Sequence, residues 1–351
     1  MYYDILSGVF KTTYADLLQA LEYERVERHA KAGREGSFVL RTVKGRPYWY
    51  LQISGKDRRL EYVYVGADSE SLRSAINDAK RLRGAITPLR ASLLATGGFQ
   101  FVRQSSDVLS LLGDSGLFLS GAVLVGTNAF LSYQNAFGIR WKTLTIDTMR
   151  TRDIDFAQFS QFRVGVPLNV ADNMKKALRD LEASPIWKSL SKKGWPYVYQ
   201  LNDREKFDIE FLTPMIGPHQ ENPVPLPWLG VGAQPLRFME YLVEGAFPAV
   251  AIVDKGAVLI NLPDPGRFAL HKLIVHERRS VAHLGKKEKD LAQAASMISF
   301  LSEKHPEYLE NAWKDLTNGK PTWGEIVRRV ARKLPEDVRK TESVSRILNS
   351  K

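Results

Sequence analysis

The hydrophobic and polar positions of the first 95 residues follow two different periods. Residues 14–32 place leucine, valine and alanine at helical spacing among charged residues, and glycines end the pattern. Three later runs alternate in the manner of strands, with turn-forming residues between them: 37–40, 48–53 and 60–65. A second helix, capped by Asp68 or Ser69, then runs through a basic stretch. The pattern predicts a small antiparallel sheet flanked by helices.

The pattern changes after residue 95. In residues 96–216 short apolar runs alternate with helical segments, which is typical of an α/β or α+β domain. Residues 214–235 are rich in proline and glycine, and we expect an ordered excursion between domains there. From about residue 236 the periodicity is mostly helical, apart from a hairpin expected within residues 249–260. We therefore expect three domains, at 1–95, 96–216 and 217–351.

The most informative local pattern is the segment 151–156, in which Asp153 and Asp155 alternate with apolar residues. Residues two apart on a strand point to the same face, so the two carboxylates are expected side by side. That arrangement is costly unless a cation neutralises it. Mg²⁺ prefers oxygen ligands and commonly pairs one or two carboxylates with substrate phosphates. The segment therefore predicts a Mg²⁺ site.

A second pattern lies upstream, in residues 121–130. It predicts a buried strand, a tight turn at Gly126-Thr127, and a helix that begins near Asn128. Unpaired backbone N–H groups at a helix start, together with a hydroxyl group, form a natural phosphate-binding site. Small residues at the turn let a triphosphate approach the backbone.

A third pattern lies downstream, where Asp208 and Glu210 repeat the alternation of acidic and apolar residues. A strand here could supply a third carboxylate next to Asp153 and Asp155. Such a group would be placed to take a proton from an acceptor hydroxyl. The alternation points Asp208 and Glu210 the same way, so both remain candidates.

Taken together, these residues resemble the nucleotidyltransferase superfamily that includes DNA polymerase beta. The resemblance is closest to a bacterial group that is distantly similar to abortive-infection and toxin nucleotidyltransferases. It rests on the segments 124–130, 152–155, 211–214 and 267–273, followed by 278–279 and 289–291, and it extends to residues 45–51. It implies an α+β fold, with a mixed-sheet nucleotidyltransferase core and a helical C-terminal domain that closes the cleft. It also implies a toxin-like or defence role.

The resemblance assigns roles to individual residues. Asp153, Asp155 and Glu210 would bind Mg²⁺ or Mn²⁺, with Glu210 preferred to Asp208 because it directly precedes residues 211–214. Gly126, Thr127, Asn128, Lys272 and Arg278 would hold the phosphates of a nucleoside triphosphate. The pattern departs from the superfamily in two respects: the turn is Gly-Thr, and the spacer between Gly126 and Asp153 is long.

Basic residues follow Lys272 on the same stretch. Arg278 and Arg279, with the lysines at 286, 287 and 289, either contact phosphate or nucleic acid or form a solvated helix face. The histidines at 271, 276 and 283 lack metal-ligand spacing, and we expect core or surface positions for them.

Composition narrows the class of partner. The chain has 351 residues, a formal net charge of +11 and no cysteine. A basic balance favours polyanionic partners such as nucleic acid, and a chain without cysteine suits a reducing cytoplasm. We expect neither a signal peptide nor a membrane span, because residues 1–4 lack a basic segment followed by an apolar run and no stretch approaches the ~20 apolar residues that span a bilayer. In the N-terminal sheet, the tyrosines of residues 48–64 alternate with basic residues: Arg41, Lys44, Arg46, Arg58 and Arg59. The aromatic residues either stack on the bases of a nucleic acid or are buried as core.

We therefore expect an enzyme that transfers a nucleotidyl group from an NTP to an acceptor hydroxyl. RNA or tRNA is the favoured acceptor and a protein is the alternative. The competing hypothesis is a nucleic-acid-binding or regulatory protein that has the same fold but little turnover. The Gly-Thr turn and the long spacer favour this alternative.

Overall fold

The computed structural model describes most of the chain. The described residues are 2–30, 36–43, 45–54, 60–142, 151–159, 169–186, 194–280, 284–318 and 321–349. No helix in these ranges is long and apolar enough to cross a membrane.

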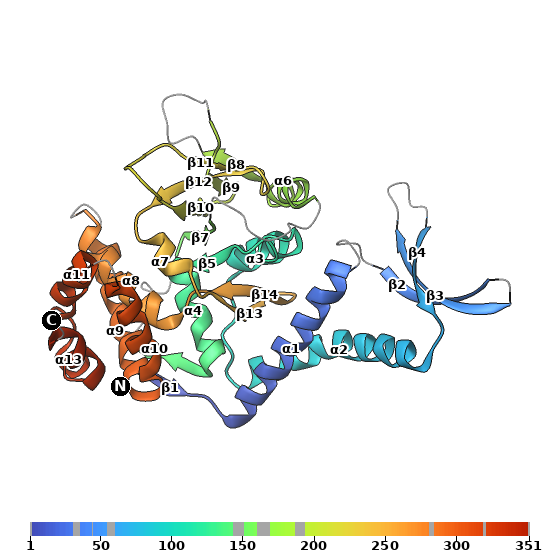
Figure 1. Cartoon of the computed structure of the whole chain (residues 1–351), viewed down its shortest axis with the longest axis horizontal. Helices are drawn as coiled ribbons and strands as arrows, with labels where there is room; N and C mark the ends of the chain where they lie inside the picture. The colour runs from blue at the N-terminus through green and yellow to red at the C-terminus, as the bar shows by residue number, and fades with distance from the viewer. Residues whose placement is uncertain are drawn as a thin grey trace.

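A mixed sheet, here called the central sheet, lies in the upper part of the molecule in the view of Figure 1. Its main path runs in the order β11-β12-β10-β7-β5, and β9 and β8 continue from β10. The pairs β7–β10 and β10–β12 are parallel, whereas β5 pairs with β7 antiparallel. The strand bounds are β5 Val123–Val125, β7 Asp153–Ala157, β8 Ala183–Ile186, β9 Val198–Leu201, β10 Asp208–Pro214, β11 Val224–Leu226 and β12 Val231–Leu236.

Alternation along β7 and β10 explains why these strands lie at the centre. Ile154 and Phe156 are buried, as are Ile209 and Phe211 on the neighbouring strand. The rings of Phe156 and Phe211 stack with their centroids 5.9 Å apart. Because side chains alternate, burial of these apolar residues turns the intervening acidic residues to the opposite face.

The stretch expected as an excursion between domains is instead part of the sheet, because residues 214–235 contain β11 and most of β12. Pro225 lies on β11 at the end of the strand order, where the missing N–H group costs no ladder hydrogen bond. The central sheet therefore continues beyond residue 216.

Helices pack around this sheet. The α4 helix, Gly126–Phe137, follows β5 without a loop and is buried over most of its length. The hairpin expected from the sequence forms from β13 Phe247–Val253 and β14 Gly256–Leu262. A single hydrophobic core extends from the sheet into the C-terminal helices. The remaining helices of this part are α3 Arg103–Asp114, α6 Val170–Asp180, α7 Met239–Val243, α8 Pro265–Arg278, α9 Leu284–Lys304, α10 Pro306–Thr317, α11 Pro321–Ala331, α12 Glu336–Arg339 and α13 Glu342–Asn349.

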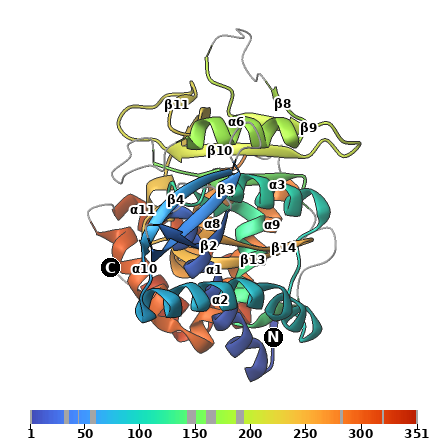
Figure 2. The ribbon, with the colours of Figure 1, turned by 90° about the vertical axis from the view of Figure 1, so that its right-hand side faces the viewer.

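The N-terminal part begins on the body and then leaves it. The first strand, β1 Tyr3–Ile5, pairs antiparallel with β6 Ile139–Trp141. Two long helices, α1 Gly8–Ala30 and α2 Glu70–Ala95, flank a three-stranded antiparallel sheet, which projects away from the core (Figures 1 and 2). Its strands are β2 Gly36–Val43, β3 Arg46–Ser54 and β4 Leu60–Ala67. The expected α+β class, with its mixed-sheet core, N-terminal sheet and helical C-terminal part, is confirmed.

Candidate active site

Four carboxyl groups lie side by side on one face of the central sheet. Strands β7 and β10 run parallel in a register that pairs Asp153 with Asp208 and Asp155 with Glu210. Paired residues on adjacent strands point to the same face. All four are partly buried. The structure therefore brings together acidic groups that lie more than fifty positions apart in the sequence.

Three of these groups line a cavity of about 220 Å³, here called the carboxylate cavity. Asp153, Asp155 and Glu210 contribute to it, whereas Asp208 does not. The Oδ1 atom of Asp208 instead accepts a hydrogen bond from Gln200 Nε2 at 2.8 Å. The remaining lining residues come from the β5–α4 turn, β10, β12 and the helices: Val125, Gly126, Leu212, Leu236, Met239, Leu242, Phe268, His271, Lys272, Val275, Arg279 and Lys286.

The carboxyl groups in the cavity differ in charge. Burial, followed by repulsion from Asp153 and Glu210, raises the pKa of Asp155 to about 8. Burial also acts to raise the pKa of Asp153, but a hydrogen bond from Thr151 and the charge of Lys286 outweigh it, so that this pKa is lowered. At neutral pH Asp153 is therefore ionised and Asp155 is mostly protonated. A cation placed between them would favour ionisation of both.

Gly126 brings the first turn of α4 against Asp155. Its backbone has φ of 68°, a left-handed conformation that favours glycine. A Cβ atom at this position would overlap Oδ2 of Asp155 and lie 3.3 Å from its Cγ. The residue before the helix, Val125, provides no side-chain cap. The backbone N–H groups of the first turn are therefore available to an anion in the cavity.

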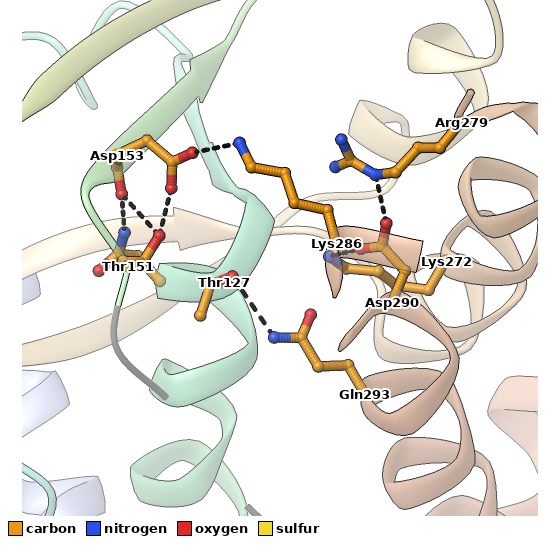
Figure 3. A network of polar contacts seen from close by, with 9 residues as sticks. Thr127, Thr151, Asp153, Lys272, Arg279, Lys286, Asp290 and Gln293 are labelled. Atoms are coloured by element: carbon orange, nitrogen blue, oxygen red, sulfur yellow. Dashed lines mark hydrogen bonds and ion pairs between the residues drawn. The ribbon is translucent and has the colours of Figure 1, made fainter. Parts of the chain in front are cut away.

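The side chains of Thr127 and Asn128 form hydrogen bonds within the protein. The Thr127 hydroxyl accepts a hydrogen bond from Gln293 Nε2 on α9 at 3.4 Å (Figure 3). Asn128 is buried, donates to the backbone carbonyl of Asp153 at 2.9 Å and accepts from Ser105. The helix also begins at Gly126, earlier than the predicted start near Asn128. Both side chains therefore hold neighbouring elements to α4.

Cationic side chains from α8 and α9 face the acidic strands. Lys272 is buried, and its Nζ lies 2.8 Å from Oδ1 of Asp290. The other oxygen of Asp290 accepts from Nε of Arg279 at 2.5 Å. Lys286 extends across the cavity, and its Nζ lies 3.2 Å from Oδ2 of Asp153 (Figure 3). Burial, followed by the charge of Lys272, lowers the pKa of Lys289 to about 8, as expected where cations are crowded.

The pairing of these cations did not follow from the sequence. Asp290 lies in a run of charged residues whose local pattern does not single it out, and Lys286 could not be told from a solvated lysine. Arg278 was expected at the triphosphate, yet Arg279 lines the carboxylate cavity and Arg278 does not. The guanidinium of Arg278 instead lies 5.0 Å from the ring centroid of Phe238. One step along a helix turns a side chain by about 100°, so adjacent arginines face different surroundings.

The histidines also fall outside a metal site. His271 and His276 are buried, and His283 lies outside the described residues. Within the described ranges, no group of three or more histidine and acidic side chains could hold a metal ion. Mg²⁺ seldom needs such a group, because it keeps water and substrate phosphates among its ligands. Asp153 and Asp155, whose mutual repulsion is evident in the pKa of Asp155, fit an ion that is held together with a phosphate.

Part of the chain matches a known protein family. A family model described as a nucleotidyltransferase matches residues 103–318. No curated protein matches the sequence. A crystal structure of an antigenic nucleotidyltransferase-like protein from Paracoccidioides brasiliensis is similar at 12% sequence identity, covering 65% of this chain and 94% of that chain, with a TM-score of 0.31. The family match spans more than half of the chain and includes every residue that lines the carboxylate cavity, so this chain belongs to that nucleotidyltransferase family and is an enzyme of the nucleotidyltransferase type.

Proposed function

We propose that this enzyme transfers a nucleoside monophosphate from an NTP to an acceptor hydroxyl in a Mg²⁺-dependent reaction. One observation supports this above all. Three carboxyl groups, an uncapped helix start and three cationic side chains all line one cavity of about 220 Å³. Enzymes of this type generally use an NTP and a divalent metal ion, and this cavity has groups of the right charge for each.

The proposed reaction forms a bond between the acceptor oxygen and the α-phosphorus of the NTP. The bond from that phosphorus to the oxygen bridging to the β-phosphorus breaks, and pyrophosphate leaves. Asp153 and Asp155 would hold Mg²⁺ (or Mn²⁺), which supplies neutralisation of the phosphate oxygens when it is bound. Glu210 lies beside Asp155 and would take the proton of the acceptor hydroxyl.

The phosphates would lie between the first turn of α4 and the helices that carry the cations. Gly126 offers backbone N–H groups without a side chain in the way. Lys272, Lys286 and Arg279 line the same cavity and supply the positive charge. In the structure these cations pair with Asp290 and Asp153. A bound triphosphate would exchange part of that pairing for contacts to phosphate.

RNA is the acceptor that we favour. The net charge of +11 suits a polyanion. The N-terminal sheet adds an aromatic surface, in which the rings of Tyr50 and Tyr64 are 5.8 Å apart. The guanidinium of Arg41 lies 3.8 Å from the ring centroid of Tyr62. Such pairs of arginine and aromatic residues stack on the bases of single-stranded RNA.

Trp49 lies on the opposite face of the same sheet, and its Nε1 donates to Asp68 at 2.9 Å. The basic residues Lys44, Arg58 and Arg59, which were expected near the tyrosines, lie outside the described residues. The tyrosine surface with Arg41 is therefore the part of the N-terminal sheet on which the RNA proposal rests.

The test is a transfer assay with label in the α-phosphate. The protein is incubated with each labelled NTP, Mg²⁺ and total RNA or cell lysate, and released pyrophosphate is measured in parallel. We expect label on a macromolecule that ribonuclease destroys and protease does not. The Asp153→Asn variant should give no label. Label that protease removes would identify a protein acceptor, and absence of label with every NTP would favour a binding protein with little turnover.

A toxin-like or defence role, which the resemblance of the sequence implies, stays a prediction. It is tested by induced expression of the wild type and of Asp153→Asn. Growth arrest by the wild type alone would support it.

A further inference from the structure

A second and larger cavity adjoins the carboxylate cavity on the side of β12. It measures about 400 Å³, within the usual range of ~300–1,000 Å³ for small-molecule sites. We call it the β12-side cavity. The two cavities share five lining residues: Leu236, Met239, His271, Val275 and Arg279. A molecule in one cavity would therefore lie next to a molecule in the other.

We infer that the β12-side cavity is the acceptor subsite and binds the terminal nucleotide of the acceptor RNA. This rests on the proposed function. The order of the strands places the two cavities relative to the chemistry. The phosphate-binding turn follows β5, Asp153 and Asp155 lie on β7, Glu210 lies on β10, and the larger cavity lies at β12.

This order matches the geometry of in-line displacement. The attacking oxygen and the leaving oxygen lie on opposite sides of the phosphorus that is transferred. If the pyrophosphate lies against Gly126, the acceptor hydroxyl approaches from beyond Glu210. The β12-side cavity is at that position, and Glu210 lies between it and Asp155 along the sheet.

The lining of this cavity suits a base with a phosphate attached. Its inner surface is apolar and includes Phe238, whose ring faces the guanidinium of Arg278 at 5.0 Å. An aromatic ring and a planar cation stack on any nucleobase. Arg237 and Arg279 also line the cavity. Among the described residues, the lining therefore contains three arginines and one acidic residue, Glu221. Positive charge in excess favours the phosphodiester group that accompanies an RNA base.

The backbone of Phe238 is strained, as is common at ligand-binding sites. Phe238 has φ of 68°, a left-handed conformation that is costly for a residue with a bulky side chain. Conformations of this kind cluster at ligand sites, where the surrounding structure maintains them. Here Trp323 packs on Phe238, with the ring centroids 4.5 Å apart.

His271 adds a polar group at the junction of the two cavities. Only 7% of the residue is exposed, and the residue lines both cavities. Burial, followed by the charge of Lys272, lowers the pKa of His271 to about 3, so the ring is neutral at physiological pH. A neutral imidazole presents one donor and one acceptor. Buried polar groups are normally hydrogen-bonded, so this ring suits a ligand that offers both, such as the edge of a nucleobase.

The test separates binding from turnover. The probe is a short single-stranded RNA without a 3′-hydroxyl group, which cannot be extended, and its dissociation constant is measured by fluorescence polarisation. We expect Arg278→Met to weaken binding by about 5- to 30-fold, the usual effect of losing a cation–π contact. His271→Leu should weaken it by a similar factor, and His271→Gln should restore most of the loss. The matched control is Arg332→Met, which removes the same charge from an exposed position that lines neither cavity.

The affinity for a non-hydrolysable NTP, measured by calorimetry, provides the second readout. Arg278→Met should leave this affinity within twofold of the wild type. Unchanged RNA binding in both Arg278→Met and His271→Leu, with wild-type melting temperatures, would overturn the inference. A loss of NTP affinity with unchanged RNA binding would also overturn it, by assigning the cavity to the base of the NTP. Because the probe cannot react, failure of the transfer assay would contradict the proposed function and leave this binding test valid.

Discussion

Gly126 and Asp155 are in such close contact that no larger residue fits at position 126. A Cβ atom there would overlap the Oδ2 atom of Asp155. The pair joins the end of β5 to the middle of β7, where Val125 is the register partner of Asp155. The contact therefore fixes the distance between the start of α4, where we propose that phosphate binds, and the proposed metal-binding carboxyl group.

The first prediction concerns this contact. Gly126→Ala should abolish nucleotidyl transfer, because the new methyl group displaces the Asp155 carboxyl group. Gly121→Ala is the matched control, since Gly121 also has positive φ, at 90°, but a Cβ atom added there would have no neighbour within 4 Å. Both variants should lose ~1–2 kcal/mol of stability from the left-handed backbone. Transfer assays and thermal unfolding decide the matter, and equal activity of the two variants would contradict the prediction.

A second prediction separates the two acids of β10. Glu210→Gln should lower kcat by ~10²-fold or more, as expected for loss of a general base. Asp208→Asn should have only a small effect, because Asp208 does not line the cavity and is bound to Gln200. The two positions share a strand and a face, which makes them a close pair for comparison. If Asp208→Asn is the inactive variant, the third acid has been assigned to the wrong residue.

The raised pKa of Asp155 leads to a third prediction. Its value is about 8 in the folded protein, against 3.8 for an ordinary aspartate. Between these pH values the folded state keeps a proton that the unfolded chain has lost. The free energy of unfolding therefore falls as the pH rises through this window, and the full cost is reached above about pH 8. Asp155→Asn remains neutral and avoids this cost.

Melting temperatures in EDTA, measured from pH 5 to pH 9, test this prediction. The variant should melt above the wild type at pH 9, by ~2–5 °C. The difference should shrink as the pH falls. Addition of Mg²⁺ should narrow the difference at high pH, because a cation stabilises the ionised form in the wild type. A difference that does not depend on pH would show that Asp155 is not the titrating group.

The fourth prediction concerns Asp290, which pairs with both Lys272 and Arg279 while almost fully buried. Asp290→Asn leaves two cations without a counter-charge, and we expect a loss of ~3–5 kcal/mol in the free energy of unfolding by urea. Asp315→Asn is the control, because Asp315 pairs with Arg267 at an exposed position and should cost ~0.2–1 kcal/mol.

Removal of one of the stranded cations should reverse part of this loss. The double variant Lys272→Met, Asp290→Asn should therefore be more stable than Asp290→Asn alone. If the single variants at 290 and 315 lose equal stability, the buried pairs contribute no more than a surface ion pair.

The sequence by itself determined the features that depend on local geometry. Alternation along a strand is enough to place Asp153 and Asp155 on one face, because successive side chains always point to opposite sides. Two apolar runs around a turn predicted the hairpin of β13 and β14, and helical periodicity predicted the helical C-terminal part. The resemblance to nucleotidyltransferases is confirmed by the family match over residues 103–318.

Only the tertiary structure decided which distant groups meet. The parallel register of β7 and β10 selects Glu210, and not Asp208, as the acid next to Asp155. The packing of α9 brings Lys286 to Asp153, from 133 positions away, and turns Gln293 to the Thr127 hydroxyl. Contacts of this kind depend on how whole elements pack and exclude water. The local sequence around Lys286 or Gln293 therefore has the same pattern whether the side chain faces solvent or a distant polar group.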